Sequence, residues 1–342
     1  MDVDKHQILE DFLQNLEFKH KSFDMSDMIL RDDSPHPLEY CRTYGHTENT
    51  HDGQMKLLLA DEWSIMLGLL HICEKSHTTL QGLGFGRLET EAAKVAVVVA
   101  GAAPGDHFAD LTKTFDFVDF HLYDPKQRWY PSLEWYASRR DGNVCLYKQK
   151  FELETARAWA DKKGYEHVIF LSDLRTGDGM VTEQVEGDME NQREMTKEIG
   201  ACYSVLKFRP RYYDDDTPEG KKILTYFDGT IYLQGYPPNN STETRLHVTD
   251  TSSEKEYKIK DYQNQLFYHN QVTRNTKLRL FEPGALSYDN AHARFVKGFL
   301  LDNLRPLGQG ISERDRDYRG QLKFDHDRIR ALLQDFKCLV DE

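Results

Sequence analysis

The rhythm of hydrophobic and polar positions changes twice along the chain. From Gln54 to about Lys75 apolar residues recur at three- and four-residue intervals, which predicts a helix. Between Lys94 and Leu206 short apolar runs such as VAVVVAG, FVDFHLYD and HVIFLSDL alternate with helical stretches. Short apolar runs separated by helices are typical of a parallel sheet covered on both faces. The sequence therefore predicts an α/β protein with a Rossmann-like, mostly parallel sheet. Two further runs, 230–236 and 244–248, predict an antiparallel hairpin at one edge.

The segments on either side of this core have different patterns. Residues 1–52 are acidic, rich in His and Asp, and carry prolines at 35 and 37, which predicts an arm lying on the main body. Residues 53–302 are expected to form the main domain and residues 303–342 a helical tail. Amphipathic stretches near 257–274, 286–302 and 326–339 predict helices.

Composition narrows the classes of partner and compartment. The 342 residues include 57 acidic and 44 basic side chains, a net charge of −13, so any nucleic-acid partner must be held by a local basic patch. The five cysteines form no C-x-x-C pair, which predicts neither a zinc site nor a disulfide framework. The start, MDVDKHQ, is not a secretion signal, and the longest apolar run covers about half a membrane span. We expect no membrane contact and a reducing compartment.

The turn after the first strand of the predicted sheet, AGAAPGDHF at 100–108, is the usual ligand contact of a doubly wound fold. Gly101 and Gly105 let the backbone approach a ligand closely. The turn has neither a GxGxxG pattern nor the Lys-Ser/Thr end of a phosphate loop, which favours a nucleoside ligand such as S-adenosylmethionine. Asp124 ends the next strand, and a carboxylate at this place in the fold accepts hydrogen bonds from ribose hydroxyls. An ordinary tight turn with a surface aspartate is the alternative.

Five segments of the chain resemble successive motifs of one family. They are DGQMKLLLADEW, VVVAGAAPGDH, VIFLSDLRTGDG, SVLKFRPRYYDD and NNSTETRLHV. In this order they are similar to the poxvirus cap-specific mRNA (nucleoside-2′-O-)-methyltransferases, which also serve as the regulatory subunit of the viral poly(A) polymerase. The similarity runs from about Tyr40 to about Asn275.

This resemblance implies the methyltransferase form of the Rossmann-like fold, with S-adenosylmethionine as the methyl donor and S-adenosylhomocysteine as the product. It implies no metal. It also implies a cytoplasmic location, in the host cytoplasm or the virion if the protein is viral, with the nucleus as the alternative. The partners it implies are the m7G-capped 5′ end of mRNA and the catalytic subunit of a poly(A) polymerase.

The resemblance also places a Lys-Asp-Lys-Glu tetrad at Lys56, Asp173, Lys207 and Glu243. A ribose hydroxyl is a poor nucleophile at neutral pH, so an enzyme that methylates it must align and activate the oxygen. Lys207 is expected to contact the 2′-OH and either take its proton or stabilise the developing alkoxide. The two carboxylates would hold the lysines in register. Without the resemblance, both lysines would be interpreted as ion-paired surface residues.

For the cofactor the resemblance implies a larger set of contacts, namely Gly101, Ala103, Gly105, His107, Asp124, Phe151 and Asp173. Phe151 would form an apolar wall beside the adenine, although its segment is equally typical of ordinary core.

Cap recognition calls for another pattern. N7-methylguanine carries a positive charge, so two aromatic rings that sandwich it distinguish it from guanine. The resemblance assigns these rings to Tyr212 and Tyr40, with Tyr44 as a rival for the second. A base-facing acid falls on Asp214, and the second falls on Gln263, where either the amide carbonyl accepts the base hydrogen or the alignment slips to Asp261.

The RNA body needs positive groups. Arg175, Arg209, Arg211 and Arg274 are expected to contact RNA phosphates or ribose, and solvated surface arginines are the alternative. The leading hypothesis is therefore a 2′-O-methyltransferase that converts a cap-0 end into cap-1. A ribosomal RNA ribose methyltransferase and a regulatory subunit of a poly(A) polymerase are the other two.

Overall fold

The protein is described from a computed structural model. The described residues are 23–40, 50–85, 94–126, 128–139, 142–161, 164–176, 181–274 and 288–304. The chain divides into two compact units, Met1–Leu300 and Leu301–Glu342, and only residues 301–304 of the second are described. Tyr44, the predicted helix at 326–339 and most of the predicted tail therefore lie outside the described residues.

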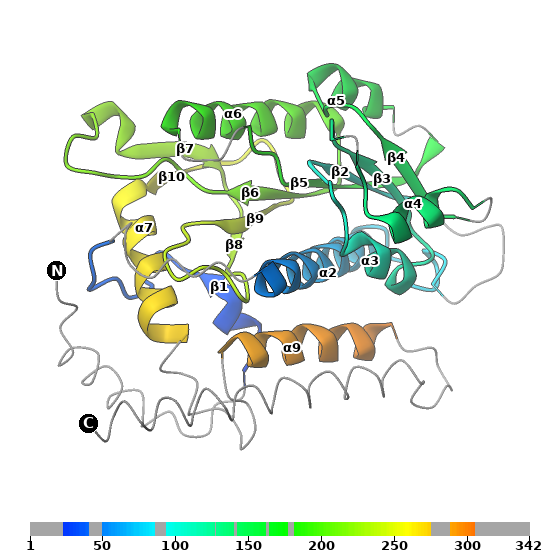
Figure 1. Ribbon diagram of the computed structural model, residues 1–342, viewed down its shortest axis with the longest axis horizontal. Coiled ribbons are helices and arrows are strands. Elements are labelled where there is room, and N and C mark those ends of the chain that lie inside the picture. The colour runs from blue at the N-terminus through cyan, green and yellow to red at the C-terminus, as the bar shows by residue number, and fades with distance from the viewer. Residues whose placement is uncertain are drawn as a thin grey trace. The chain divides into compact units, whose positions relative to one another are not determined.

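An eight-stranded sheet forms the centre of the first unit (Figure 1), in the order β1-β8-β9-β6-β5-β2-β3-β4. The strands are β1 (Ile29–Leu30), β2 (Val95–Ala100), β3 (Asp119–Tyr123), β4 (Val144–Tyr147), β5 (His167–Ser172), β6 (Tyr203–Phe208), β8 (Thr230–Tyr232) and β9 (Thr244–Val248). Strands β6, β5, β2, β3 and β4 run parallel, whereas β9 is antiparallel to both β6 and β8. The Rossmann-like methyltransferase fold and its antiparallel hairpin are thus confirmed. Strand β1, from the predicted arm, extends that edge.

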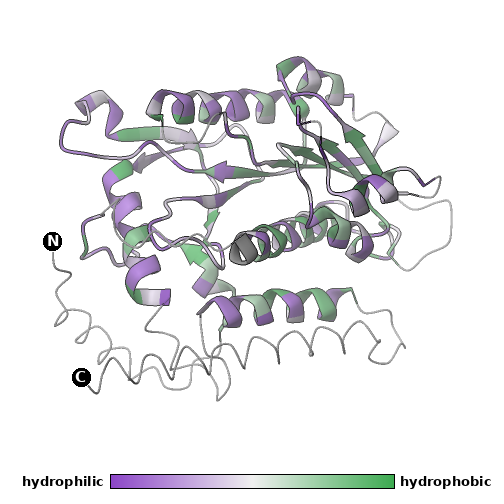
Figure 2. Ribbon diagram, in the orientation of Figure 1, coloured by the Kyte–Doolittle hydropathy of each residue, from purple (hydrophilic) through white to green (hydrophobic). Residues whose placement is uncertain are grey.

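Local sequence explains why the central strands form. All six residues of β2, VAVVVA, are buried, as are five of the six in β5. β-branched side chains suit a pleated strand, and strands covered on both faces consist of continuous hydrophobic runs. Figure 2 shows these central strands as hydrophobic. The core therefore lies along the sheet, and only the strand ends are left for polar chemistry.

Helices cover both faces of the sheet, with α5 and α6 on one side and α2 and α3 on the other (Figure 1). The helices are α2 (Thr50–Lys75), α3 (Phe108–Thr114), α4 (Pro131–Ala137), α5 (Leu153–Trp159), α6 (Thr182–Ile199), α7 (Ile259–Tyr268) and α9 (Tyr288–Asn303). Single 3₁₀ turns occupy η2 (Met25–Met28) and η4 (Glu219–Lys221), and a π-helical segment, η5 (His269–Thr273), continues α7. Within the described part of the chain, none of the helices combines the length and hydrophobicity needed to cross a membrane.

The structure corrects one predicted boundary. The segment Glu254–Lys258 is a strand, β10, paired antiparallel with β7 (Ile223–Phe227) in a separate two-stranded sheet. Helix α7 therefore begins at Ile259, not at 257 as predicted. Tyr257 is buried, and its hydroxyl donates to the Phe227 carbonyl at 2.8 Å. This long-range pairing overrides the helical periodicity of the local sequence.

Strand register gathers polar residues at one edge of the sheet. The carboxyl ends of parallel strands face the same way, so the loops after β2, β3, β4 and β5 and the end of β6 meet there. Lys207 on β6 lies opposite Arg245 on the antiparallel β9. The Asp173 amide donates to the Ala100 carbonyl at 2.9 Å, which fixes the loop after β5 against the end of β2.

Candidate active site

The four residues of the predicted tetrad converge in the structure. Lys207 Nζ lies 3.1 Å from Asp173 Oδ1 and 3.2 Å from Glu243 Oε2. Lys56 Nζ lies 3.0 Å from Glu243 Oε1. The four side chains come from α2, the loop after β5, the end of β6 and the residue before β9, so the sheet edge and one helix bring together residues far apart in sequence. Lys207 is thus held between two carboxylates.

A fifth charged residue belongs to this cluster and was missed by the sequence reasoning. Arg245 Nη1 donates to Asp173 Oδ1 at 2.7 Å, and the arginine side chain is only 4% exposed. Arg245 stands two residues after Glu243, and side chains two positions apart share one face of a strand. That spacing, in the strand TRLHV, is the sequence signal that could have identified Arg245 as a member of the cluster.

The charges of the cluster stabilise one another. Burial alone would raise the pKa of Glu243, but the ammonium groups of Lys207 and Lys56 lower it well below its usual value. For Asp173 burial again opposes ionisation, and Arg245 with Lys207 outweighs it, so the pKa is lowered. Burial lowers the pKa of Arg245, but Asp173 and Glu243 raise it by more. Both carboxylates are therefore ionised at neutral pH and can orient the two lysines.

A cavity of about 570 Å³ opens beside the tetrad. Seven of its lining residues are predicted site residues, namely Gly101, Ala103, Asp124, Phe151, Asp173, Arg175 and Lys207. Phe151 is buried against Tyr123 and Phe170, with ring centroids 5.0 and 5.3 Å away, so it serves the core and still faces the cavity. The structure therefore brings most of the predicted cofactor residues to the same space as two tetrad residues.

The loops around this cavity are shaped for close approach. Gly101 has φ +86°, and a Cβ atom there would lie 2.9 Å from the Asp173 carbonyl oxygen. Asp124 accepts from the Ala103 amide at 3.1 Å and from the Lys126 amide at 2.8 Å, which fixes its carboxylate at the cavity wall. This carboxylate and the open backbone suit the ribose and amino-acid parts of a nucleoside such as S-adenosylmethionine, so the donor set fits that cofactor.

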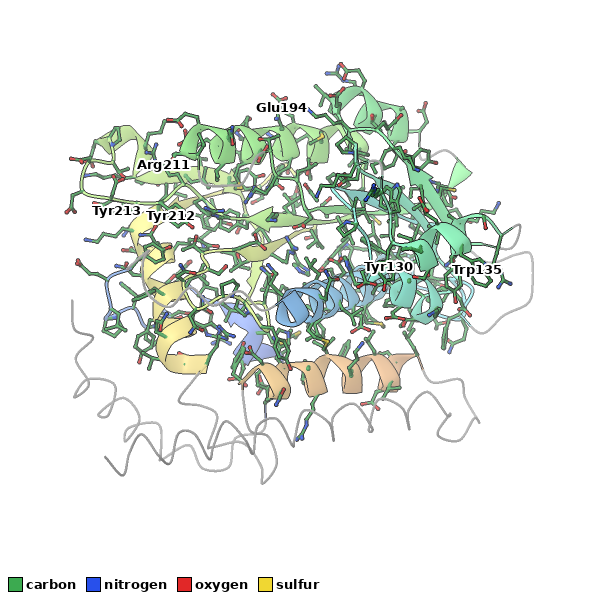
Figure 3. The ribbon with its side chains drawn as sticks, in the orientation of Figure 1. Tyr130, Trp135, Glu194, Arg211, Tyr212 and Tyr213 are labelled. Carbon is green, nitrogen blue, oxygen red and sulfur yellow. The ribbon has the colours of Figure 1, made fainter. Side chains whose placement is uncertain are left out.

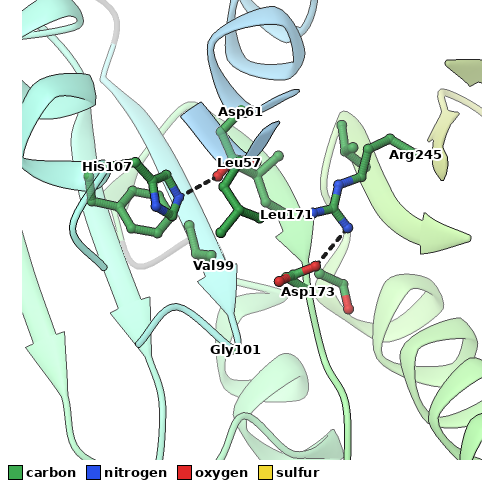
Figure 4. Close-up of a pocket in the computed structure, with 11 residues that line it drawn as sticks. Leu57, Asp61, Val99, Gly101, His107, Leu171, Asp173 and Arg245 are labelled. Atoms are coloured by element: carbon green, nitrogen blue, oxygen red, sulfur yellow. Dashed lines mark hydrogen bonds and ion pairs between the residues drawn. The ribbon is translucent and has the colours of Figure 1, made fainter. Parts of the chain in front are cut away.

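His107 and Gly105 lie elsewhere. His107 Nε2 lies 2.9 Å from Asp61 Oδ2 of α2, and both residues line a smaller pocket that shares Gly101 and Asp173 with the cavity (Figure 4). Gly105 has φ +75°, and a Cβ atom there would lie 2.8 Å from Leu133 Cδ2, so its place is a packing contact with α4. Asp61 is a further polar residue that sequence reasoning missed, because its partner comes from another element.

Arg175 also faces the cavity. Its Nη1 donates to the Leu174 carbonyl at 3.3 Å, whereas Nε and Nη2 have no hydrogen-bond partner among the described residues. Burial lowers the pKa of this guanidinium, which stays charged because arginine titrates far above neutrality. These two nitrogens are shielded from solvent, so Arg175 beside the cavity keeps two hydrogen-bond donors that no described group uses.

The two predicted cap-stacking rings meet in the structure. The ring centroids of Tyr40 and Tyr212 lie 5.6 Å apart with an interplanar angle of 22°. Aromatic carbons in contact lie about 3.5 Å apart, so a base between two parallel rings needs them about 7 Å apart. We call this pair the aromatic clamp. The two rings stack on each other here, and admitting a base requires them to move apart.

Two successive residues of α7 hold the two sides of the aromatic clamp. Asn264 Oδ1 accepts from the Tyr40 amide at 3.0 Å. Gln263 accepts from the Tyr213 amide at 3.0 Å and donates to the Tyr213 carbonyl at 3.2 Å. Both ends of the Gln263 amide are thus engaged with backbone, so its predicted contact with a guanine base would need that backbone pairing to break.

The remaining predicted contacts have diverse surroundings. Asp214 is exposed and accepts from the Thr217 hydroxyl at 2.8 Å. Arg209 lies over the Tyr212 ring, with Cζ 4.7 Å from the centroid. Arg211 Nη1 pairs with Glu186 at 3.2 Å.

Arg274 differs from these residues because it is buried. Its Nη2 lies 2.6 Å from Asp289 Oδ2, and its Nη1 donates to the Pro237 carbonyl at 2.9 Å. An RNA phosphate would have to displace the Asp289 carboxylate to reach this arginine.

Among the residues that the structure describes, no cluster of three or more His, Cys, Asp or Glu side chains is arranged to hold a metal ion.

The family comparison covers this whole site. Residues 37–307 match the family model described as poly A polymerase regulatory subunit. The chain belongs to this family. The match includes the tetrad and both clamp residues.

The other comparisons add less. No curated protein matches the chain significantly. One similar solved structure is the crystal structure of coclaurine N-methyltransferase bound to N-methylheliamine and SAH, with 10% sequence identity and a TM-score of 0.25 over 89% of this chain and 83% of that chain.

Proposed function

We propose that this protein transfers a methyl group from S-adenosylmethionine to the ribose 2′-OH of the first transcribed nucleotide of m7G-capped mRNA. The observation that carries the proposal is Lys207, held 3.1 and 3.2 Å from two carboxylates at the wall of a cavity that also presents Asp124 and Phe151. When bound, S-adenosylmethionine supplies a methyl group on a positively charged sulfur, which an oxygen nucleophile attacks with release of the sulfide.

The chain's own residues orient the nucleophile. Asp173 and Glu243 fix the Lys207 ammonium or amine at one point of the cavity wall, and Lys56 shares Glu243. A hydroxyl placed at Lys207 Nζ is aligned for attack on the methyl group. To form the ether, this hydroxyl must also lose its proton. As the neutral amine, Lys207 Nζ would accept that proton; as an ammonium, it would stabilise the alkoxide as it forms while the proton leaves to solvent. Asp124 would accept hydrogen bonds from the ribose hydroxyls of the cofactor, and Phe151 would pack against its adenine.

The aromatic clamp supports the choice of a capped substrate over another RNA. A ribosomal RNA ribose methyltransferase needs the tetrad but has no use for two aromatic rings beside an exposed acid. Here Tyr40, from the predicted arm, stacks on Tyr212, and Asp214 lies in the turn that follows. We infer that m7-guanine enters between the two rings as they separate, and that Asp214 accepts hydrogen bonds from its edge.

The test is methyl transfer from radiolabelled S-adenosylmethionine to m7GpppA-capped RNA. Lys207→Ala is expected to lower the rate by about a thousandfold with the fold and cofactor binding retained. Lys197→Ala, which removes a half-exposed lysine paired with Glu254 on the outer side of α6, is the matched control and should leave the rate unchanged. A capped RNA with a 2′-deoxy first nucleotide should accept no label. Unchanged methylation by Lys207→Ala, or label on the deoxy substrate, would refute the mechanism.

The family match supports a second function, regulation of a poly(A) polymerase. Both roles can coexist, because the tetrad occupies only one edge of the sheet. Copurification of Lys207→Ala with a poly(A) polymerase catalytic subunit, together with longer tails in its presence, would show that the second role does not depend on methyl transfer. Loss of both effects in the absence of unfolding would tie the two roles to one site.

A further inference from the structure

An exposed aromatic surface lies on the far side of the cavity from the aromatic clamp. Trp135 of α4 is 56% exposed, and Tyr130, which precedes that helix, is 44% exposed. Tyr136 packs edge-to-face against Trp135, with ring centroids 5.1 Å apart. Figure 3 shows Tyr130 and Trp135 close to α4, whereas Tyr212 and Tyr213 lie at the opposite end of the sheet. Isolated exposed aromatics are common, but neighbouring ones indicate a binding surface.

This surface is basic, although the chain as a whole is acidic. Between residues 125 and 150 the exposed, described charged side chains are Lys126, Arg128, Glu134, Arg139, Lys148 and Lys150. Five are basic and one is acidic, and that acid, Glu134, lies 3.5 Å from Lys148 Nζ. In a protein with a net charge of −13, such a local basic excess is the feature that a polyanion requires.

Cations and rings are also interleaved on this surface. Arg139 Cζ lies 5.1 Å from the Trp135 ring centroid, and Lys113 Nζ, which also pairs with the exposed Asp110 at 3.4 Å, lies 5.4 Å from that of Tyr136. Proteins that hold single-stranded nucleic acid combine a positive track for phosphates with aromatic faces on which bases stack. A hydrophobic protein partner would call for apolar side chains around the rings, so the observed pattern favours RNA.

The sheet connects this surface to the tetrad. Lys126 follows β3 and Lys150 follows β4, and both line the cavity that Lys207 also lines. Strands β5, β2 and β3 lie between β6 and β4, so at about 4.8 Å per strand the two ends are roughly 19 Å apart. The Tyr130 amide donates to the Pro104 carbonyl at 2.8 Å, which anchors the start of α4 to the loop after β2.

We propose that residues 125–130 and α4 bind the single-stranded RNA downstream of the methylated nucleotide, with Lys126, Arg128 and Lys150 on its phosphates and Trp135 stacked on a base. The proposal rests on the proposed function for the direction of the strand: cap at the aromatic clamp, first nucleotide at Lys207, RNA body toward α4. It assigns the RNA a defined path across the carboxyl edge of the sheet.

The test measures binding of a fluorescent, uncapped single-stranded RNA of roughly twelve nucleotides by anisotropy. Trp135→Ala is expected to weaken binding about tenfold, because loss of one stacked base costs that much, and Trp135→Phe should restore most of it. Arg128→Ala should weaken binding and reduce the slope of log K against log salt by about one. Ile223→Ala, at an apolar residue of β7 that is 47% exposed, is the control and should bind RNA normally.

Methylation assays separate this proposal from the proposed function. The minimal substrate m7GpppA is too short to reach α4, so Trp135→Ala should methylate it as the wild type does and lose efficiency only on long capped RNA. If the wild type methylates neither substrate, the proposed function fails while the RNA-binding data still decide on the surface. Wild-type RNA affinity in both Trp135→Ala and Arg128→Ala would overturn the inference. If those variants instead lose a protein partner, the surface is a protein interface.

Discussion

The tetrad and the aromatic clamp are assembled from equally distant parts of the chain, yet they are built in opposite ways. Each tetrad lysine has a carboxylate within 3.2 Å, and Arg245 and the strand pairing of β6 with β9 lock the cluster further. In the clamp, Tyr40 and Tyr212 both lie on segments without regular secondary structure, and their two rings contact each other.

This difference suits the roles proposed for the two regions. Chemistry on a hydroxyl requires a fixed amine and carboxylates, and strand ends supply a rigid frame. Recognition of a flat, charged base requires two faces that separate and close on it, and segments held by a few side-chain bonds permit that motion. Rings that stack on each other also keep their facing surfaces covered until a base enters between them.

The largest effect is expected from breaking the fixed region. Glu243→Gln removes the carboxylate shared by Lys56 and Lys207, so the two cations lose their common partner. We expect kcat/KM for capped RNA to fall about a hundredfold, and the free energy of unfolding to fall by about 3 kcal/mol, since a nearly buried pair is broken.

The matched control for this variant is Glu254→Gln, which removes a surface carboxylate paired with Arg193 and Lys197. It should leave kcat/KM unchanged. Methyl-transfer kinetics and urea unfolding measure the two quantities. If Glu243→Gln keeps wild-type kcat/KM, the cluster is structural only and the contrast with the clamp disappears.

A smaller and more selective effect is expected from the aromatic clamp. Tyr212→Ala removes one stacking face, so KM for capped RNA should rise about tenfold while methylation of uncapped RNA stays as it was. Tyr212→Trp should retain capped affinity. Tyr213→Ala is the control, because that ring lies beside Lys260 instead of Tyr40. An equal loss on capped and uncapped substrates would show that Tyr212 supports the fold and does not read the cap.

The smallest effect concerns the scaffold beneath the tetrad. His247 of β9 is buried, and burial, with Arg245 nearby, lowers its pKa to about 3 from 6.5. The folded protein keeps the imidazole neutral while the unfolded chain takes up a proton near pH 6.5. The stability this group contributes is therefore complete above pH 6.5 and is lost as the pH falls toward 3.

His247→Gln cannot titrate and offers an amide to the Tyr203 hydroxyl, which lies 2.7 Å from His247 Nδ1. Between pH 6 and pH 5 the free energy of unfolding should fall in both proteins. The fall should be steeper in the wild type than in the variant, by about 1.4 kcal/mol per pH unit. Urea unfolding at both pH values measures this, with the exposed His36→Gln as the control. Identical pH slopes in wild type and His247→Gln would contradict the assignment.

Particular residues show how far sequence reasoning reached. The resemblance identified Lys56, Asp173, Lys207 and Glu243, because each sits in a recognisable motif, and the structure brings them together. Arg245 stands two residues after Glu243, a spacing that could have identified it, but only the register of β9 against β6 brings it beside Asp173. The start of α7 was misplaced because β10 pairs with β7, a segment about thirty residues earlier.

For the predicted cap-binding and RNA-binding residues as well, part of the arrangement was predicted and part is visible only in the structure. The resemblance paired Tyr212 with Tyr40, with Tyr44 as a rival, but did not indicate that the rings of Tyr40 and Tyr212 stack on each other. Arg274 and Arg175 were both predicted to contact RNA. In the structure Arg274 pairs with Asp289, whereas two donors of Arg175 have no partner among the described residues.

The sequence by itself determined the central strands β2, β3, β4, β5 and β6 and the chemical types available at their ends, because apolar periodicity and turn residues act over a few neighbouring positions. Only the tertiary structure decided which charges neutralise each other, which rings touch and which basic side chains gather around α4. Those outcomes depend on strand register and helix packing between segments far apart in the sequence, such as Tyr40 and Asn264, which are separated by 224 positions. A local pattern carries no information about such distances, because the free energy of each contact is set by partners that only the folded chain supplies.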